Sequence, residues 1–351
     1  MIIVLKPGIT AEEVDRVISR IHELGLGTDV SRGKFRTVIG VIGEEDLVRT
    51  LPLEALPGVE KVMPILSRYK LASREFKPQA TVLAVKGLTI GGGTFCVIAG
   101  PCAVESRQML FETARACRDA GAHILRGGAF KPRTSPYSFQ GLGREALVML
   151  KECADELNMP TVTEVMDPRD VELVARHADI LQIGARNMQN FNLLTEAGAS
   201  GKPVMLKRGL SASVEDLLMS AEYILSSGNR SVILCERGIK TFETSVRNSL
   251  DISSVPALRE RTHLPIFVDP SHAGGHWQYV APLARAALAA GADGIMVEVH
   301  PAPETALCDG PQQLRPEKFR RMMDQLRALD AVMSVMRAEL FGQERENPEI
   351  L

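Results

Sequence analysis

The sequence predicts an α/β protein: a closed (β/α)8 TIM barrel preceded by a small N-terminal α+β domain. From residue 95 onward, short apolar runs rich in β-branched residues alternate with amphipathic stretches of roughly 10 to 16 residues. An open doubly wound sheet is the alternative, but it would typically have only about six strands. We therefore expect a barrel over residues 95–340. Its eight predicted strands are FCVIAG, HILRGG, TVTEV, DILQIG, PVMLK, SVILCER, PIFVDP and GIMVEV.

The N-terminal residues 1–70 have a different pattern, in which strands and helices follow the split βαβ order of a small α+β sandwich. Thr10 and Glu13 form a capping-box pattern at the start of the first helix. Residues 71–94 read as a linker followed by a hairpin, TVLAVKG then LTIGGG. The expected elements of residues 1–70 are strands at 2–5, about 28–31, 36–43 and 60–64, and helices at 10–24 and 44–51.

Charge and cysteine content exclude several classes of function. The 41 basic and 43 acidic residues leave a net charge of −2, so no overall field would attract nucleic acid or an anionic membrane. The six cysteines are scattered, which is typical of reduced thiols in a cytoplasmic protein rather than of a disulfide framework. No long apolar segment resembles a signal peptide or a membrane span. We expect a cytoplasmic protein without nucleic-acid or membrane partners.

Polar or charged residues follow every predicted barrel strand. In this fold the C-terminal strand ends carry the active site, and charges buried there are costly unless partners or ligands neutralise them. The pattern therefore predicts a ligand site at this end. The residues are Cys102, Arg126, Lys131, Glu164, Gln182, Arg186, Lys207, Arg208, Glu236, Arg237, Asp269, His272, Glu298 and His300.

Six cations among the strand ends and first loops predict an anion site. A single exposed Arg or Lys is often only solvated, but six converging in a nearly neutral protein favour binding of phosphate or carboxylate. The segment KPRTSPYSFQG adds the hydroxyls of Thr134 and Ser135 beside two of these cations. The six are Arg126, Lys131, Arg133, Arg186, Lys207 and Arg237.

A metal site is the second candidate. Cys102, His272, Glu298 and Asp309 follow different strands and form no local motif, so Cys102 could equally be an inert buried thiol and His272 a core histidine. One sulfur, one nitrogen and two carboxylates would accept Zn, Fe, Mn or Co, and the sequence does not choose among them.

Seven segments together resemble 3-deoxy-D-arabino-heptulosonate 7-phosphate (DAHP) synthases. The similarity covers residues 80–330, and residues 1–70 resemble the ferredoxin-like regulatory domain found in one subgroup of that family. The segments are FCVIAGPCAVES, LRGGAFKPRTSPYSFQG, QIGARNMQN, VMLKRG, ILCERG, VDPSHAGG and MVEVHP.

The resemblance implies a metal-dependent transferase that condenses phosphoenolpyruvate with erythrose 4-phosphate and water, the first step of the shikimate pathway. It implies one divalent ion (Mn, Fe, Co or Zn), held by Cys102, His272, Glu298 and Asp309. Carried over by motif, phosphoenolpyruvate would contact Arg126, Lys131, Ala185, Arg186, Lys207 and Arg237. The sugar phosphate would contact Arg133, Thr134 and Ser135, and Asp269 is expected among the substrate-binding residues. We further expect Lys131 to donate a proton and Glu164 to orient the attacking water.

The resemblance also implies regulation and assembly. An aromatic amino acid, tyrosine or phenylalanine, would bind the N-terminal domain, and the chain would form a homotetramer. Two rival functions stay open: the related 3-deoxy-D-manno-octulosonate 8-phosphate synthase, whose phosphate loop typically reads KANRSS rather than KPRTS, and a non-catalytic sensor of phosphoenolpyruvate or an amino acid.

Overall fold

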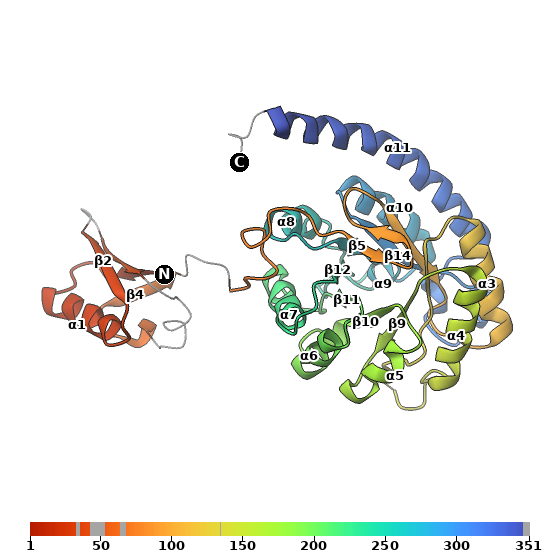
Figure 1. The fold of residues 1–351 in the computed structure, drawn as a ribbon, viewed down its shortest axis with the longest axis horizontal. Coiled ribbons are helices and arrows are strands. Elements are labelled where there is room, and N and C mark those ends of the chain that lie inside the picture. Colours follow the sequence, from red (N-terminus) through yellow and green to blue (C-terminus); the bar gives the residue numbers. More distant parts are fainter. Residues whose placement is uncertain (33–35, 43–52, 64–67, 134, 347–351) are drawn as a thin grey trace. The chain divides into compact units, whose positions relative to one another are not determined.

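The computed structural model describes residues 1–32, 36–42, 53–63, 68–133 and 135–346. The chain divides into two compact units, Met1–Arg68 and Tyr69–Leu351. Figure 1 shows a small sheet with one long helix in the first unit and a barrel in the second.

The first unit is a four-stranded antiparallel sheet in the order β2-β3-β1-β4, packed against one helix. Its β2 is the strand expected around residues 28–31, whereas the helix expected at 44–51 lies outside the described residues. This is the ferredoxin-like arrangement. The elements are β1 Ile2–Leu5, α1 Ala11–His22, β2 Gly27–Arg32, β3 Thr37–Ile42, the 3-10 turn Leu53–Ala55 and β4 Val59–Met63.

Helix α1 begins as its sequence predicts. The Thr10 hydroxyl accepts the Glu13 N–H at 3.3 Å, and the Glu13 carboxylate accepts the Thr10 N–H at 3.0 Å, which completes the capping box. Val14, Val17 and Ile21 are buried in the core of this unit because their spacing places them on one face of the helix.

The second unit is a closed parallel barrel, as predicted. Each strand pairs with the next one in the chain, and β14 pairs with β7 to close the ring. The strands are β7 Cys96–Gly100, β8 Ile124–Arg126, β9 Thr161–Val165, β10 Ile180–Ile183, β11 Val204–Lys207, β12 Val232–Glu236, β13 Ile266–Val268 and β14 Gly294–Glu298.

Helices surround the barrel and connect its strands (Figure 1). The last, α11, packs against α10 and α3 and continues beyond the barrel wall. Among the described residues, no helix has the length and apolar character needed to cross a membrane. The helices are α3 Arg107–Asp119, α4 Arg144–Leu157, α5 Val171–Ala175, α6 Phe191–Ala199, α7 Val214–Ser226, α8 Ser254–Arg261, the short α9 Pro270–Gly274, α10 Trp277–Ala289 and α11 Pro316–Glu346.

A hairpin blocks the N-terminal end of the barrel. Its strands are β5 Leu83–Val85 and β6 Leu88–Ile90, and its buried side chains join the barrel interior, which includes Ile98 and Phe267. Alternate strand residues such as Val97 instead belong to the core between barrel and helices. Apolar packing therefore fills the interior and its N-terminal end, which leaves the C-terminal end for polar groups.

Candidate active site at the C-terminal end of the barrel

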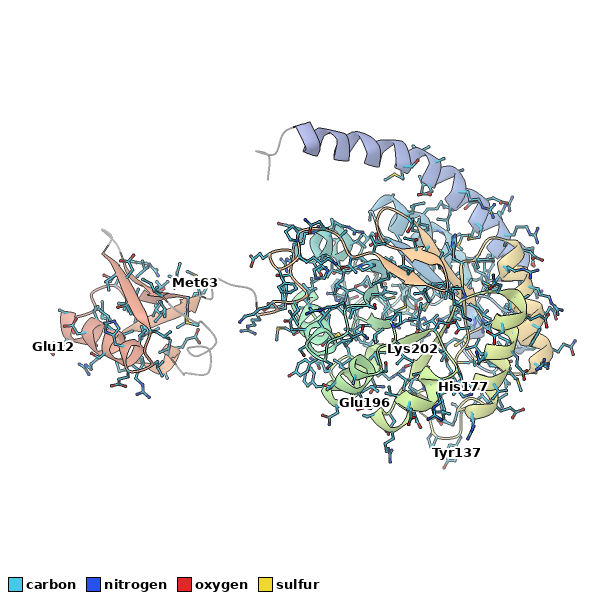
Figure 2. All side chains as sticks on the ribbon, viewed as in Figure 1. Glu12, Met63, Tyr137, His177, Glu196 and Lys202 are labelled. Carbon is cyan, nitrogen blue, oxygen red and sulfur yellow. The ribbon has the colours of Figure 1, made fainter. Side chains whose placement is uncertain are left out.

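A cavity of about 460 Å³ opens at the C-terminal ends of the strands. Tyr137, in the loop between β8 and α4, projects from the edge of this unit and is 96% exposed (Figure 2). Cys102, Asp269 and Glu298 lie fully buried and do not line the cavity, and Thr134 lies outside the described residues. The sequence-predicted residues that do line it are Arg126, Lys131, Arg133, Ser135, Glu164, Gln182, Ala185, Arg186, Lys207, Arg237, His272 and Asp309.

The four predicted metal-binding residues come together in two overlapping groups. His272, Glu298 and Asp309 place one nitrogen and two carboxylate oxygens within 4.8 Å of one another. Cys102, Cys308 and Asp309 do the same with two sulfurs and one oxygen. Asp309 belongs to both groups, so the two describe one continuous cluster of possible ligands.

Local structure directs each of these side chains. Glu298 is the last residue of β14, and Asp309 has left-handed backbone geometry, with φ of 50°, where it precedes the 3-10 turn Gly310–Gln312. His272 lies in α9, whose N-cap Asp269 accepts the His272 N–H at 2.9 Å. Cys102 follows β7, and its N–H donates to the Gln313 side chain at 3.1 Å.

The chemistry of this cluster fits a divalent transition-metal ion. Glu298 Oε1 is buried, forms an ion pair with Arg126 Nη2 at 3.1 Å and lies 3.6 Å from His272 Nε2. Burial raises the pKa of Glu298, but His272 and Arg126 outweigh it, and the net pKa is lowered. The carboxylate is therefore anionic, and a cation between the carboxylate and the imidazole would satisfy both groups.

Asp269 connects the metal cluster to the cations of the cavity. Its Oδ2 lies 2.5 Å from Lys207 Nζ and 2.7 Å from His272 Nδ1. Burial alone would raise the pKa of Asp269, but His272 and Lys207 hold it well below the usual value. A charged carboxylate in this position fixes both partners, so its direct contacts are with protein groups.

Cations dominate the rest of the cavity. Arg126 and Lys131 are almost fully buried and reach the cluster, since Arg126 Nη2 lies 3.1 Å from Glu298 and Lys131 Nζ lies 3.1 Å from Cys102 Sγ. Among the described residues, no carboxylate lies within ion-pair distance of Arg186 or Arg237. Burial lowers the pKa of Arg237. An anionic ligand would compensate the buried positive charge of Arg237.

Glu164 faces the same cavity from β9. It is paired with Gln182 of β10, whose Nε2 donates to Glu164 Oε2 at 3.3 Å. The glycine at position 184 leaves room for the Glu164 side chain, because a Cβ atom on residue 184 would lie 2.0 Å from Glu164 Oε1.

Four residues of the site were missed by sequence reasoning. Arg247 Nη1 lies 3.3 Å from Asp309, and Gln312 donates to Glu298 at 2.6 Å. Cys308 touches Cys102, and Gln313 accepts the N–H of Cys102. In the sequence, only the Cys-Asp and Gln-Gln pairs that flank Gly310 and Pro311 could have indicated Cys308, Gln312 and Gln313. No local sequence pattern identifies Arg247 as a site residue.

Comparison with known proteins agrees with this geometry. The family model described as the DAHP synthetase I family matches residues 74–334, and the model of the DAHP synthase ferredoxin-like domain matches residues 1–67. A phospho-2-dehydro-3-deoxyheptonate aldolase of Thermotoga maritima is 52% identical over 335 residues, covering 95% of this chain and 99% of its own. A 2-dehydro-3-deoxyphosphooctonate aldolase of Syntrophobacter fumaroxidans is 34% identical over 260 residues, covering 69% of this chain and 89% of its own.

Solved structures agree as well. The crystal structure of the Thermotoga maritima aldolase, also titled DAHP synthase, superposes with a TM-score of 0.89 at 51% identity, covering 95% of this chain and 97% of that one. A truncated form of the synthase from the same organism gives a TM-score of 0.71 at 51% identity, covering 76% of this chain and 97% of its own. The family models span nearly the whole chain, and the barrel mouth holds a metal-type ligand cluster ringed by cations: the chain belongs to the DAHP synthetase I family.

Proposed function

We propose that the protein is a DAHP synthase, which condenses phosphoenolpyruvate with erythrose 4-phosphate and water to give DAHP and inorganic phosphate. The observation that carries this proposal is the position of the ligand cluster, directly beside the buried cations of one cavity. The two substrates bring several negative charges into a small volume, and the cations would neutralise them so that the reacting carbons can approach.

Phosphoenolpyruvate is assigned to five of the cations that line the cavity and to one backbone group. The proposal places its phosphate and carboxylate against six groups that line the cavity, with Asp269 acting on the set through its contact with Lys207. Arg133 and Ser135, farther along the β8 loop, would hold the sugar phosphate together with Thr134. The six groups for phosphoenolpyruvate are Arg126, Lys131, the backbone at Ala185, Arg186, Lys207 and Arg237.

The ligands assigned to one divalent ion are Cys102, His272, Glu298 and Asp309, and Mn, Fe, Co and Zn all suit this set. When bound, such an ion would act as a Lewis acid on the aldehyde oxygen of erythrose 4-phosphate. C3 of phosphoenolpyruvate then attacks the aldehyde carbon, and a water adds at C2 before phosphate leaves.

Two side chains are assigned to proton and water handling. Lys131 would give its proton to the alkoxide that forms from the aldehyde, since its ammonium group lies beside Cys102 at the floor of the cavity. Glu164 would orient the water that adds to C2, because its carboxylate reaches the cavity and is held by Gln182.

The ferredoxin-like unit is assigned to regulation. We propose that tyrosine or phenylalanine binds it and inhibits the barrel, and that the enzyme is a cytoplasmic homotetramer. Support comes from the match of residues 1–67 to the ferredoxin-like domain of DAHP synthases.

Phosphate release from phosphoenolpyruvate tests the reaction. The assay compares erythrose 4-phosphate with arabinose 5-phosphate, before and after chelation, with divalent ions added back. Release that needs erythrose 4-phosphate, stops on chelation and returns with metal is the expected result. Release only with arabinose 5-phosphate would indicate a 3-deoxy-D-manno-octulosonate 8-phosphate synthase, a class to which this chain is also similar. Release with neither sugar would favour a non-catalytic sensor.

A further inference from the structure

We propose that Cys308 is a second thiolate ligand of the metal, beside Cys102, and that it shifts the preference of the site toward soft ions such as Zn²⁺ and Cd²⁺. This inference rests on the proposed function, because it extends the ligand set by one residue. The Sγ atoms of Cys102 and Cys308 lie 3.2 Å apart, and both lie within 4.8 Å of a carboxylate oxygen of Asp309. Thiolates select soft metals.

Cys308 is paired with a cation in the same way as the proposed acidic ligands. Each acidic donor of the cluster has its own cation: Cys102 has Lys131 at 3.1 Å, Glu298 has Arg126 at 3.1 Å, and Asp309 has Arg247 at 3.3 Å. Cys308 follows the same rule, because Arg133 Nη1 lies 2.7 Å from its Sγ.

The four paired cations also determine the net charge of the site. With two thiolates and two carboxylates, the ligand set carries four negative charges, and a divalent ion neutralises only two of them. The four cations more than offset the two remaining negative charges, so a second thiolate leaves no uncompensated negative charge at this site.

The backbone on both sides of Cys308 is fixed, which holds the thiol toward the cluster. The Leu307 N–H donates to Glu105 at 2.9 Å, and the Cys308 carbonyl accepts the Gln313 side chain at 2.8 Å. Two thiolates at about 2.3 Å from one ion, with an angle of roughly 90–120° between them, would be about 3.3–4.0 Å apart. The sulfurs therefore need to separate by at most about 0.8 Å to admit the ion.

The other buried thiols lack these features. Cys117 and Cys153 belong to the apolar core between barrel and helices, and Cys96 and Cys235 belong to the barrel interior. Cys308, by contrast, lines the cavity and contacts a guanidinium group. Cys153 therefore serves as a matched control for removal of a buried thiol.

Cobalt spectroscopy tests the inference directly. The full-length protein is stripped by a chelator, kept under a non-thiol reductant, and titrated with Co²⁺ while the sulfur-to-cobalt charge-transfer band is recorded. Because each bound thiolate adds to this band, Cys308→Ser should lower its intensity at saturation to about half, whereas Cys153→Ser should leave it unchanged. Equal bands in the wild type and Cys308→Ser would overturn the inference but leave the four-ligand site intact. Phosphate release by the wild-type protein, assayed separately, tests the proposed reaction itself. No band in any protein would overturn the metal site itself.

A second measurement needs no variant. Zinc-edge X-ray absorption of the wild-type protein should give two sulfur scatterers at about 2.3 Å, and a single sulfur would reject the proposal.

Competition titrations test the metal preference. Cys308→Ser should weaken the binding of Cd²⁺ relative to that of Mn²⁺ by roughly tenfold or more, since only the soft ion gains from the second sulfur.

Discussion

Asp269 Oδ2 lies 2.7 Å from His272 Nδ1, and this contact sets the orientation of the imidazole. With Nδ1 held by a buried carboxylate, Nε2 faces Glu298 Oε1 at 3.6 Å, where a metal ion would bind. A carboxylate that fixes the far nitrogen of a ligating histidine also makes the imidazole a stronger donor. The same carboxylate also contacts Lys207, so one residue joins a proposed metal ligand to a cation of the cavity.

Replacing Asp269 therefore should weaken metal binding without removing a ligand. We expect Asp269→Asn to lower Co²⁺ affinity about 10- to 100-fold, because the neutral amide holds the imidazole less strongly and carries no charge. Titration of the stripped protein measures this. Asp293→Asn is the matched control, since Asp293 is also buried and paired, with Arg259, but precedes β14 at the opposite end of the barrel. Equal loss of affinity in both variants would mean that general destabilisation, not orientation, is responsible.

The buried ion pair between Arg208 and Glu236 should contribute strongly to the stability of the barrel. Arg208 Nη1 lies 2.8 Å from both Glu236 and Asp251, and the Glu236 side chain is fully buried. We expect Arg208→Met to lower the free energy of unfolding by about 3–5 kcal/mol, because Glu236 would remain buried and uncompensated. Denaturant unfolding followed by circular dichroism measures the change.

Two variants separate this effect from loss of a surface pair. Arg315→Met removes an exposed pair with Glu304 and should cost at most about 1 kcal/mol. Adding Glu236→Gln to Arg208→Met should recover part of the loss, since the buried charge is gone. A double variant no more stable than Arg208→Met alone would contradict the charge-based explanation.

Glu164 offers a test of water orientation. Glu164→Gln keeps the shape of the side chain but removes its charge, so we expect kcat for phosphate release to fall, with little change in the KM for phosphoenolpyruvate. Glu172→Gln, an exposed residue of α5 paired with Arg176, is the control and should behave as wild type. Full turnover in Glu164→Gln would remove Glu164 from the mechanism.

Removing the ferredoxin-like unit should separate regulation from chemistry. The units Met1–Arg68 and Tyr69–Leu351 each have their own hydrophobic core, so a chain beginning at Tyr69 should fold and release phosphate. Inhibition by tyrosine or phenylalanine should be lost. Steady-state kinetics of both forms with each amino acid checks this, and inhibition that survives the truncation would place the effector site on the barrel.

The sequence by itself determined the repeated and local features. The alternation of apolar runs and amphipathic stretches predicted the barrel, because each strand and helix shows its period within a few residues. The capping box of Thr10 and Glu13 needed only four consecutive residues. The segment GTDVSR has a weak apolar pattern, so the strand conformation of β2 depends on its pairing with β3. The positions of Arg126, Lys207 and Glu298 at strand ends likewise predicted that they belong to the site.

Tertiary structure decided which of those strand ends share a site. Glu236 and Arg208 end neighbouring strands as predicted, but they pair with each other and do not line the cavity, because successive strand residues face opposite sides. His300 faces Glu105 at 3.6 Å instead of the metal cluster. Cys308 and Arg247 reach the cluster from loops whose course depends on long-range packing, and no local periodicity encodes that course.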